Sequence, residues 1–186
     1  MSEVYVHPQG LCESSDVGAG TRVWAFAHVM AGARVGEGCN ICGGAFIESG
    51  AVVGNRVTVK NGVLVWDRVT VEDDVFLGPG VVFTNDLRPR AFVKRSGPEL
   101  APTTVRRGAT IGANATVVCG IEVGAYAFVA AGSVVTADVP RQALVAGNPA
   151  RTVGWVCECG DRLDDGLRCP SCGRTFAEGD GGLKPV

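Results

Sequence analysis

An aliphatic or aromatic side chain recurs at every sixth residue along most of this chain. The run is unbroken from residue 11 to residue 83, and the same spacing resumes at residue 105, which gives nineteen such positions. At 46% hydrophobic content a run of this kind arises by chance in roughly one phase in a million. The positions are Leu11, Val17, Val23, Val29, Val35, Ile41, Ile47, Val53, Val59, Val65, Val71, Leu77, Phe83, Val105, Ile111, Val117, Val123, Val129 and Val135. A period of six fits neither helices nor long strands, so it predicts a short strand followed by a tight corner, many times over.

A second register of small or β-branched residues lies four positions after the first and runs from Thr21 to Val139. Both registers are predicted to point inward. Three units close one triangular coil, so nineteen units predict about six coils and, at about 4.8 Å per coil, a prism about 30 Å tall. Residues that tolerate a positive φ are expected at the corners. They are Gly20, Gly32, Gly38, Gly50, Asn55, Gly62, Asp73, Gly80, Asn114 and Gly132.

The period fails only over residues 84–104, a stretch rich in proline and charge. An interruption of about twenty residues is long for a connection, and solenoids carry function in such loops. We therefore predict a functional element here. Repeats alone specify a fold and not an activity, so a non-catalytic β-helix scaffold stays open.

Composition excludes several classes of partner. A net charge of −2 provides no basic field for nucleic acid or anionic membranes. No segment approaches the roughly 18 apolar residues of a membrane span, and the start Met1-Ser2-Glu3-Val4 does not resemble a secretory leader. The eight cysteines do not form the even framework of a secreted scaffold. A cytoplasmic protein with a small-molecule substrate is expected.

The segment Val129–Pro140, continued by Leu144–Arg151, resembles the closing coils of coenzyme A-dependent hexapeptide-repeat acyltransferases. The resemblance covers residues 11–151. It implies an all-β, left-handed parallel β-helix that forms a homotrimer, with the loop reaching toward a neighbouring subunit. In that family small residues let the pantetheine arm lie against the backbone and a basic residue meets the phosphates. The implied acetyl-CoA contacts are Gly112, Ala130, Gly132, Asn148 and Arg151, although residues 147–149 could simply be a turn.

Two further strings, Trp24-Ala-Phe-Ala-His28 and Asp74–Asp86 followed by Pro89-Arg90, resemble a sub-family that N-acetylates nucleotide-linked 3-amino sugars. UDP-2-acetamido-3-amino-2,3-dideoxyglucuronate is one such substrate, on the way to bacterial surface polysaccharides such as the lipopolysaccharide O-antigen. Another small amine or hydroxyl acceptor remains the alternative. Serine, maltose and antibiotic acetyltransferases usually carry a loop histidine that is absent here. The two histidines, His7 and His28, cannot supply the three-histidine zinc site of carbonic anhydrase-like β-helices.

An uncharged amine is already a nucleophile toward a thioester, so the protein chiefly has to position it and stabilise the oxyanion. Asn85 is expected to hold the amine or a neighbouring hydroxyl, unless it serves only as a turn residue. Asp86 is a candidate proton acceptor, and His28, expected at a corner, is the alternative base. The expected substrate-binding residues are Thr84, Trp24, Arg88 and Arg90, the arginines facing a diphosphate or a uronate carboxylate.

After Trp155 the repeat stops, and four cysteines follow as Cys157-Glu-Cys159 and Cys169-Pro-Ser-Cys172. Four thiolates from two short knuckles suit a structural, tetrahedral zinc ion, which a tail of about thirty residues would need in order to fold. The first knuckle has one intervening residue where two are usual, so a redox pair or a site without metal stays open. We expect a β-helix domain over 1–156 and a zinc ribbon over 157–186 that caps the last coil or contacts a partner.

Overall fold

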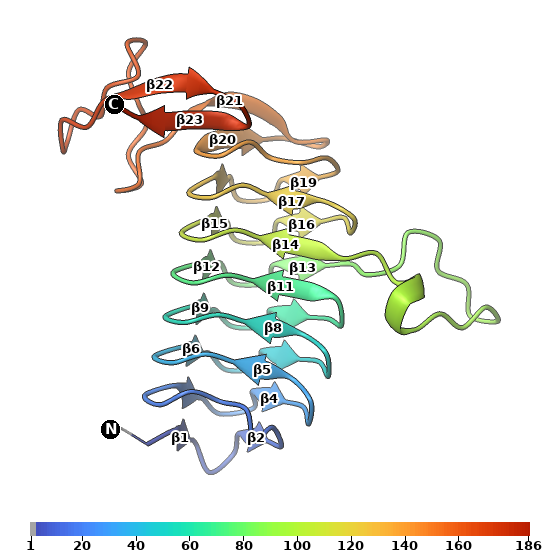
Figure 1. Cartoon of the computed structure of the whole chain (residues 1–186). Coiled ribbons are helices and arrows are strands. Elements are labelled where there is room, and N and C mark those ends of the chain that lie inside the picture. Colours follow the sequence, from blue (N-terminus) through green and yellow to red (C-terminus); the bar gives the residue numbers. More distant parts are fainter. Residues whose placement is uncertain (1–2) are drawn as a thin grey trace.

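The computed structural model describes residues 3–186 as a three-sided prism of stacked coils, with one long loop at its side and a small hairpin at its end (Figure 1). The expectation of no secretory leader rests on residues 1–4, of which the first two lie outside the described residues. Within the described part no helix is long and apolar enough to cross a membrane. The helix η1 (Gly97–Glu99) is a single 3-10 turn in the loop.

Each side of the prism is a parallel sheet of two- to four-residue strands. We call these sheets faces I, II and III. Face I contains β1 (Tyr5–Val6), β3 (Arg22–Val23), β6 (Asn40–Ile41), β9 (Thr58–Val59), β12 (Phe76–Leu77), β15 (Thr110–Ile111), β18 (Phe128–Val129) and β20 (Ala143–Ala146). Face II contains β2 (Leu11–Cys12), β4 (His28–Val29), β7 (Phe46–Ile47), β10 (Leu64–Val65), β13 (Val82–Phe83), β16 (Thr116–Val117) and β19 (Val134–Val135). Face III contains β5 (Arg34–Val35), β8 (Val52–Val53), β11 (Val69–Val71), β14 (Thr103–Val105) and β17 (Glu122–Val123). Successive strands visit the three faces in turn, and this confirms the predicted β-helix.

The number of coils exceeds the prediction of about six, because face I stacks eight parallel strands. Strand β1 precedes the first periodic position and β20 follows the last one, so both ends of the prism continue beyond the recognised repeat. Isolated bridges between Val17 and Val35 and between Val123 and Val139 extend face III in the same way. The β-helix therefore tolerates weaker repeats at its ends than in its middle.

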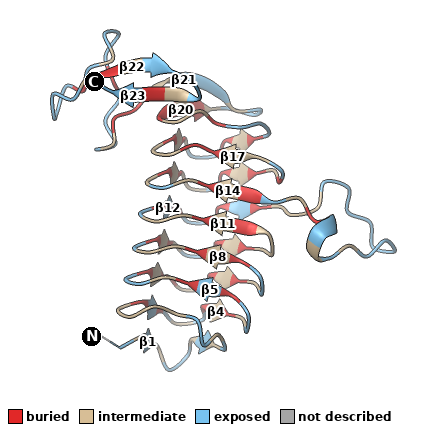
Figure 2. Ribbon diagram, in the orientation of Figure 1, coloured by how far each residue is buried: buried red, intermediate tan, exposed pale blue. Residues whose placement is uncertain are grey.

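The core is a continuous column formed by residues of both registers. Figure 2 shows buried residues along the height of the prism. Side chains alternate across a strand, so in β15 Ile111 is fully buried while its neighbour Thr110 is only partly covered. Every coil stacks like residues on like residues, and Ile111 pairs in register with Leu77 and Val129. The column contains few polar groups because the backbone satisfies its hydrogen bonds between coils.

The inward position predicted for Leu11 is wrong. Leu11 is 50% exposed, and Cys12 pairs with the buried Val29 in its place. One fewer residue separates Cys12 from Val17 than separates later members of the repeat. A slip of one residue moves a side chain to the opposite face of a strand, so the apolar Leu11 falls into the sequence period by coincidence.

The corners use a positive φ, as expected, at every predicted glycine from Gly20 to Gly132 and at Asn114. Asn55 and Asp73 are exceptions, since the following residues Arg56 and Asp74 take the left-handed conformation instead. The side chains of Asn55 and Asp73 bond to the neighbouring coil, and Asp73 Oδ1 accepts the backbone N–H of Asn55 at 2.8 Å. These two residues therefore link coils and do not supply the turn geometry.

The chain closes the prism with β21 (Arg151–Trp155), which runs antiparallel to β20. The hairpin β22 (Phe176–Gly179) and β23 (Gly182–Pro185) then lies over the last coil (Figure 1). Its turn docks by main-chain hydrogen bonds, from the N–H of Arg141 to the carbonyl of Gly181 at 2.9 Å. Residues 157–186 have a hydrophobic cluster of their own, built around Leu163, Phe176 and Leu183.

Candidate active site

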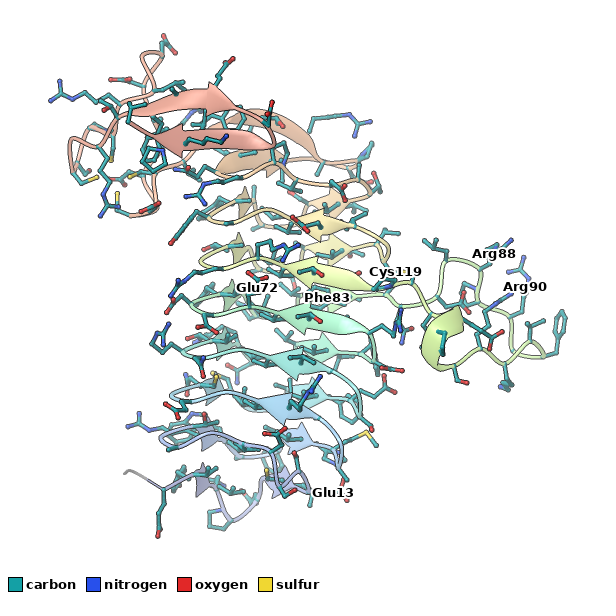
Figure 3. All side chains as sticks on the ribbon, viewed as in Figure 1. Glu13, Glu72, Phe83, Arg88, Arg90 and Cys119 are labelled. Atoms are coloured by element: carbon teal, nitrogen blue, oxygen red, sulfur yellow. The ribbon has the colours of Figure 1, made fainter. Side chains whose placement is uncertain are left out.

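The loop leaves the prism between β13 and β14, at the edge shared by faces II and III. Its two ends are held together by a hydrogen bond from the N–H of Ala101 to the carbonyl of Asn85, 2.9 Å long. Trp66 Nε1 donates to the carbonyl of Phe83 at 2.9 Å and fixes the root of the loop from the coil below. Between loop and prism lies a cavity of about 550 Å³ (Figure 3 shows the loop and its root).

The walls of this cavity carry opposite charges. Glu48 and Asp67 line it from the corners of two successive coils, and Glu48 Oε2 accepts the N–H of Asp67 at 2.7 Å. Arg90 and Lys94 line it from the loop. Arg90 donates to the carbonyl of Pro89, and within residues 3–186 neither cation forms an ion pair. A ligand with a cationic and an anionic part would therefore be oriented in this cavity.

Asn85 and Asp86 both line the cavity, but their side chains have different freedom. Asp86 is tied within the loop: its carboxylate accepts the N–H of Arg88 at 2.7 Å and a guanidinium N–H of Arg95 at 2.9 Å. These two donors hold the pKa of Asp86 below its ordinary value, which makes this carboxylate a weak base. Asn85 uses its carbonyl to close the loop, and its side-chain amide forms no hydrogen bond within residues 3–186. The amide is available to a ligand.

The expected substrate-binding residues are not all brought together. Arg88 and Arg90 lie on the outer part of the loop (Figure 3). The Thr84 hydroxyl accepts the N–H of Cys119 at 2.9 Å and so joins the loop root to the next coil. Trp24 lies at a different edge of the prism, between faces I and II, where its indole N–H donates to Asn40 Oδ1 at 2.6 Å.

His28 was expected at a corner, and this prediction is wrong. It lies on strand β4, with its side chain on the outer surface of face II. Its Nε2 lies 2.9 Å from Glu13 Oε2, and its ring packs edge-on against Phe46. Three strand spacings, about 14 Å, separate β4 from β13 along the prism. Within one chain His28 is therefore too far from Asn85 to exchange a proton with a ligand held there.

The residues expected to bind acetyl-CoA do gather, at the edge between faces I and II. Gly112 and Ala130 occupy the same corner position of successive coils, and the N–H of Gly132 donates to the carbonyl of Ala113 at 2.8 Å. Asn148 lies in the turn after β20, and Arg151 begins β21 opposite Ala146. This set lies across face II from the loop cavity.

Gly112 has a structural reason to be glycine. A Cβ at this position would lie 2.5 Å from the backbone nitrogen of Ala131 in the next coil, so the stacking of the coils itself excludes a side chain. Gly36 and Gly54, at another edge, are restricted by the following coil in the same way. The glycine at position 112 is therefore explained by coil stacking as well as by a cofactor contact. Coil stacking does not exclude a side chain at Ala130 or Gly132 in this way.

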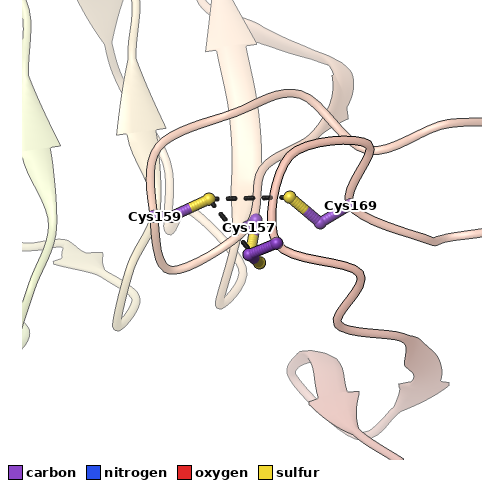
Figure 4. Close-up of side chains that lie close together, drawn as sticks. Cys157, Cys159 and Cys169 are labelled. Carbon is purple, nitrogen blue, oxygen red and sulfur yellow. Dashed lines mark hydrogen bonds between the residues drawn. The ribbon is translucent and has the colours of Figure 1, made fainter.

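The four cysteines of the tail converge, and their sulfur atoms all lie within 4.8 Å of one another. Figure 4 labels three of them, Cys157, Cys159 and Cys169. Cys157 Sγ is 3.5 Å from Cys172 Sγ, and Cys159 Sγ is 3.5 Å from Cys169 Sγ and 3.9 Å from Cys172 Sγ. Tetrahedral zinc with bonds of about 2.3 Å places its sulfur ligands about 3.8 Å apart, so the arrangement fits zinc despite the short first knuckle.

Two family models match the prism: the bacterial transferase hexapeptide (six repeats) over residues 14–49, and the hexapeptide repeat of succinyl-transferase over residues 102–137. The matches lie on both sides of the loop, in the parts of the chain where strands visit the three faces in strict rotation. Both models describe hexapeptide repeats, in agreement with the six-residue period of the sequence. The left-handed parallel β-helix predicted from its sequence is confirmed.

Curated proteins that are similar to parts of this chain include N-acetyltransferases. It is 48% identical over 81 residues to dTDP-3-amino-3,6-dideoxy-alpha-D-galactopyranose 3-N-acetyltransferase of Aneurinibacillus thermoaerophilus, a match that spans 42% of each chain. It is 57% identical over 61 residues to a 2,3,4,5-tetrahydropyridine-2,6-dicarboxylate N-acetyltransferase of Shouchella clausii, over 33% of this chain and 25% of the relative. The chain thus matches less than half the length of either relative.

Solved structures share the fold of this chain. The acetyltransferase domain of PglB from Neisseria gonorrhoeae, in complex with acetyl coenzyme A, superposes with a TM-score of 0.52 at 22% identity, over 81% of this chain and 57% of that one. A mutant GDP-perosamine N-acetyl transferase from Caulobacter crescentus, in complex with CoA and GDP-perosamine, gives 0.50 at 23% identity, over 82% and 57%. At this level of identity the likeness concerns the fold alone.

Sequence reasoning missed Glu48 and Asp67, which line the loop cavity. Neither residue belongs to a motif, and single acidic residues on a solenoid are ordinary. A usable signal was present, however, because Asp67 precedes Asn85 by eighteen residues. Eighteen residues are one coil of three hexapeptides, so the two side chains stack at the same corner.

Proposed function

We propose that this protein is an acetyl-CoA-dependent N-acetyltransferase of nucleotide-linked 3-amino sugars. The observation that carries the proposal is the divided charge of the loop cavity, with Glu48 and Asp67 on the prism wall and Arg90 and Lys94 on the loop wall. An amino sugar nucleotide has a basic amine at one end and an anionic diphosphate at the other. The 48% identity to a 3-amino sugar 3-N-acetyltransferase supports the same substrate class. A role in surface polysaccharide synthesis in the cytoplasm, including that of O-antigen, belongs to this proposal.

In the proposed reaction the acid wall attracts the sugar amine and Asn85 orients it. The amine nitrogen attacks the thioester carbonyl, the C–N bond forms, and the C–S bond breaks to release coenzyme A. Asp67 lines the cavity and forms no ion pair within residues 3–186, so in this proposal it takes the proton of the amine, which then passes to the leaving thiolate. Asp86 is already held by Arg88 and Arg95. Arg90 and Lys94 then hold the diphosphate or a uronate carboxylate, as Arg88 could from the outer loop.

The geometry also supports a homotrimer. The loop cavity and the proposed acetyl-CoA edge lie on opposite sides of face II, so one chain cannot bring the acetyl group to the amine. A threefold ring in which the loop edge of one copy meets the cofactor edge of the next would bring them together, and such a heterologous contact closes on itself. Exposed apolar residues support a buried interface, since Phe92 on the loop is 84% exposed and Val82 on face II is 42% exposed.

The first experiment measures thiol release from acetyl-CoA with a panel of UDP- and dTDP-linked 3-amino sugars. We expect turnover that Asn85→Ala and Arg90→Ala reduce at least tenfold, the loss of one charge-assisted or positioning contact. Arg34→Ala, at an exposed arginine of face III, is the matched control and should keep the parent rate. Cofactor binding without turnover on any amino sugar would retain the fold and reject the substrate class.

The shared site is tested by mixing two inactive variants. Copies with Asn85→Ala lack the amine contact, and copies with Arg151→Ala lack the expected phosphate contact. If neighbouring chains form each site together, mixed trimers contain some sites with both parent residues and recover part of the activity. Activity that stays absent after subunit exchange, although native mass spectrometry shows mixed trimers, would place the complete site within one chain.

Acetylation of another small amine is the second candidate function, favoured by the 57% identity to the tetrahydropyridine-dicarboxylate N-acetyltransferase segment. Arg90 and Lys94 would hold carboxylates of such an acceptor as readily as phosphates. The same thiol-release assay separates the two, because a dicarboxylate amine would then be acetylated in preference to every nucleotide sugar.

We further propose that residues 157–186 form a zinc ribbon with a structural role, separate from the acyltransferase domain of residues 1–156. Cys157, Cys159, Cys169 and Cys172 would hold the ion, and four thiolates leave no coordination position for catalysis. The ribbon caps the last coil through Arg141, whose guanidinium lies 3.3 Å from Glu158 Oε1 and over the ring of Tyr126. Metal analysis of the purified protein should find one zinc per chain.

A further inference from the structure

We propose that the lower part of the edge between faces I and II binds the nucleobase of the substrate; this rests on the proposed function and adds the part of the substrate that this edge would recognise. A cavity of about 450 Å³ lies there, lined by Trp24, Asn40, Cys42, Asn61 and His7. None of these residues takes part in the loop cavity. The wall is mostly apolar with a few amide and imidazole groups, which suits a planar heteroaromatic ring.

Trp24 provides a flat, preorganised surface for stacking. It is 39% exposed, and its ring is fixed from two sides. Nε1 donates to Asn40 Oδ1 at 2.6 Å, and the Tyr5 ring packs edge-on with centroids 5.7 Å apart. An exposed indole held in one orientation loses little entropy when a base stacks on it, and base–aromatic stacking contributes substantially to nucleotide affinity.

The polar groups around Trp24 match the edge of a pyrimidine. The Asn61 side chain forms no hydrogen bond within residues 3–186, so its amide offers a donor and an acceptor side by side. Uracil and thymine present an acceptor oxygen beside an N–H donor, which is the complement of an amide. His7 Nδ1 accepts the N–H of Gln9 at 3.1 Å, so its Nε2 carries the proton and can donate to a second carbonyl.

The level of this cavity along the prism agrees with the proposed site. Cys42 lies in the same coil as Glu48, and Lys60 lies in the same coil as Asp67. Gly112 lies two coils above Lys60. In a trimer whose axis runs along the prism these levels coincide between neighbours. The base at Trp24 would then lie about 10 Å, two coils, below the level of Asp67 and the amine. That separation suits a diphosphate. Lys60, which forms no ion pair within residues 3–186, lies at the level of Asp67, at the sugar end of this span, where it would share the phosphates with the Arg90 and Lys94 of the loop cavity.

The test is a calorimetric titration of the full-length protein with UDP, dTDP, CoA, ADP and inorganic pyrophosphate. We expect UDP or dTDP to bind, and Trp24→Ala and Asn61→Ala each to raise its Kd about tenfold, with CoA affinity unchanged. Asn61 is in an exposed turn, so its variant checks the site without disturbing the core. Phe76→Ala is the matched control, since this outward aromatic residue of face I is also 39% exposed.

Three results would overturn the assignment. The first is equal affinity of the parent and both variants for every nucleotide, and the second is pyrophosphate binding as tight as that of UDP. The third is loss of CoA or ADP binding in the Trp24 variant, because the cavity would then bind the adenine of the cofactor. Nucleotide binding that depends on Trp24 without acetyl transfer would leave this site standing while the proposed activity fails. Turnover of a nucleotide sugar with an unchanged KM in Trp24→Ala would support the proposed activity and reject the nucleobase site.

Discussion

Replacing Ile111 by alanine should destabilise the prism far more than replacing its neighbour Thr110. Ile111 is fully buried between Leu77 and Val129, so the change removes three carbon atoms from the core column. At about 0.8 kcal/mol for each carbon plus a cavity term, the expected loss is about 3 kcal/mol. Thr110 faces outward on the same strand, and its replacement should cost less than about 1 kcal/mol.

The assay is thermal and denaturant unfolding of the parent and both variants at one protein concentration, because association adds to apparent stability. For a chain of this size the Ile111 variant should melt about 6–12 °C below the parent, and the Thr110 variant within about 4 °C of it. Equal shifts for the two variants would refute the inward–outward alternation on β15. A loss confined to the Thr110 variant would refute it more strongly, because it would place the core on the other side of the strand.

Further predictions follow from the tail, the loop and the first coil. Removing metal with a chelator, or Cys169→Ser, should speed proteolysis within residues 157–186 while cleavage of the prism stays unchanged; equal cleavage with and without metal would contradict a zinc-dependent ribbon. Because the pKa of Asp86 is lowered, its pairing with Arg95 stabilises the loop at pH values above the unfolded-state pKa, and this contribution disappears as the pH falls through the lowered value. Amide exchange in residues 86–95 should therefore be faster in Arg95→Gln than in the parent at pH 7, and the difference should shrink as the pH falls through the lowered pKa of Asp86; a difference that did not depend on pH would exclude this ion pair as its source. Leu11→Ala should change the free energy of unfolding by less than about 0.5 kcal/mol, and a loss of 2 kcal/mol or more would show that Leu11 points inward after all.

The sequence predicted the middle of the fold better than its ends. Between Val23 and Phe83 every sixth residue lies in the core, because each coil must bury an apolar side chain at each side and nothing else fits. At Leu11 the rule failed, since a shift of one residue changes which side chain faces inward without changing the composition. Beyond Val135 the repeat weakens, yet β20 continues the stack because hydrogen bonding between coils does not require the full pattern.

The candidate site was only partly predictable. The broken period located the loop and with it Asn85, because a regular solenoid has no other reason for a long excursion. It could not show that Arg95, nine residues from Asp86, would occupy that carboxylate, since the pairing depends on how the loop turns back. Nor could it show that His28 lies three strand spacings below the loop root, a distance set by the number of coils between them.

By itself the sequence determined the period, and with it the β-helix, the place of the loop and the four-cysteine tail, because these depend on the order of residue types along the chain. The tertiary structure decided which edge each residue occupies, for that depends on counting residues through every corner. Only the folded prism shows that Glu48 and Asp67 face Arg90 and Lys94 across a cavity, and that Trp24 lies in a separate cavity at another edge. The physical reason is that coils of eighteen residues bring together side chains far apart in sequence, and one residue more or less in a turn sends a side chain to the opposite face of its strand.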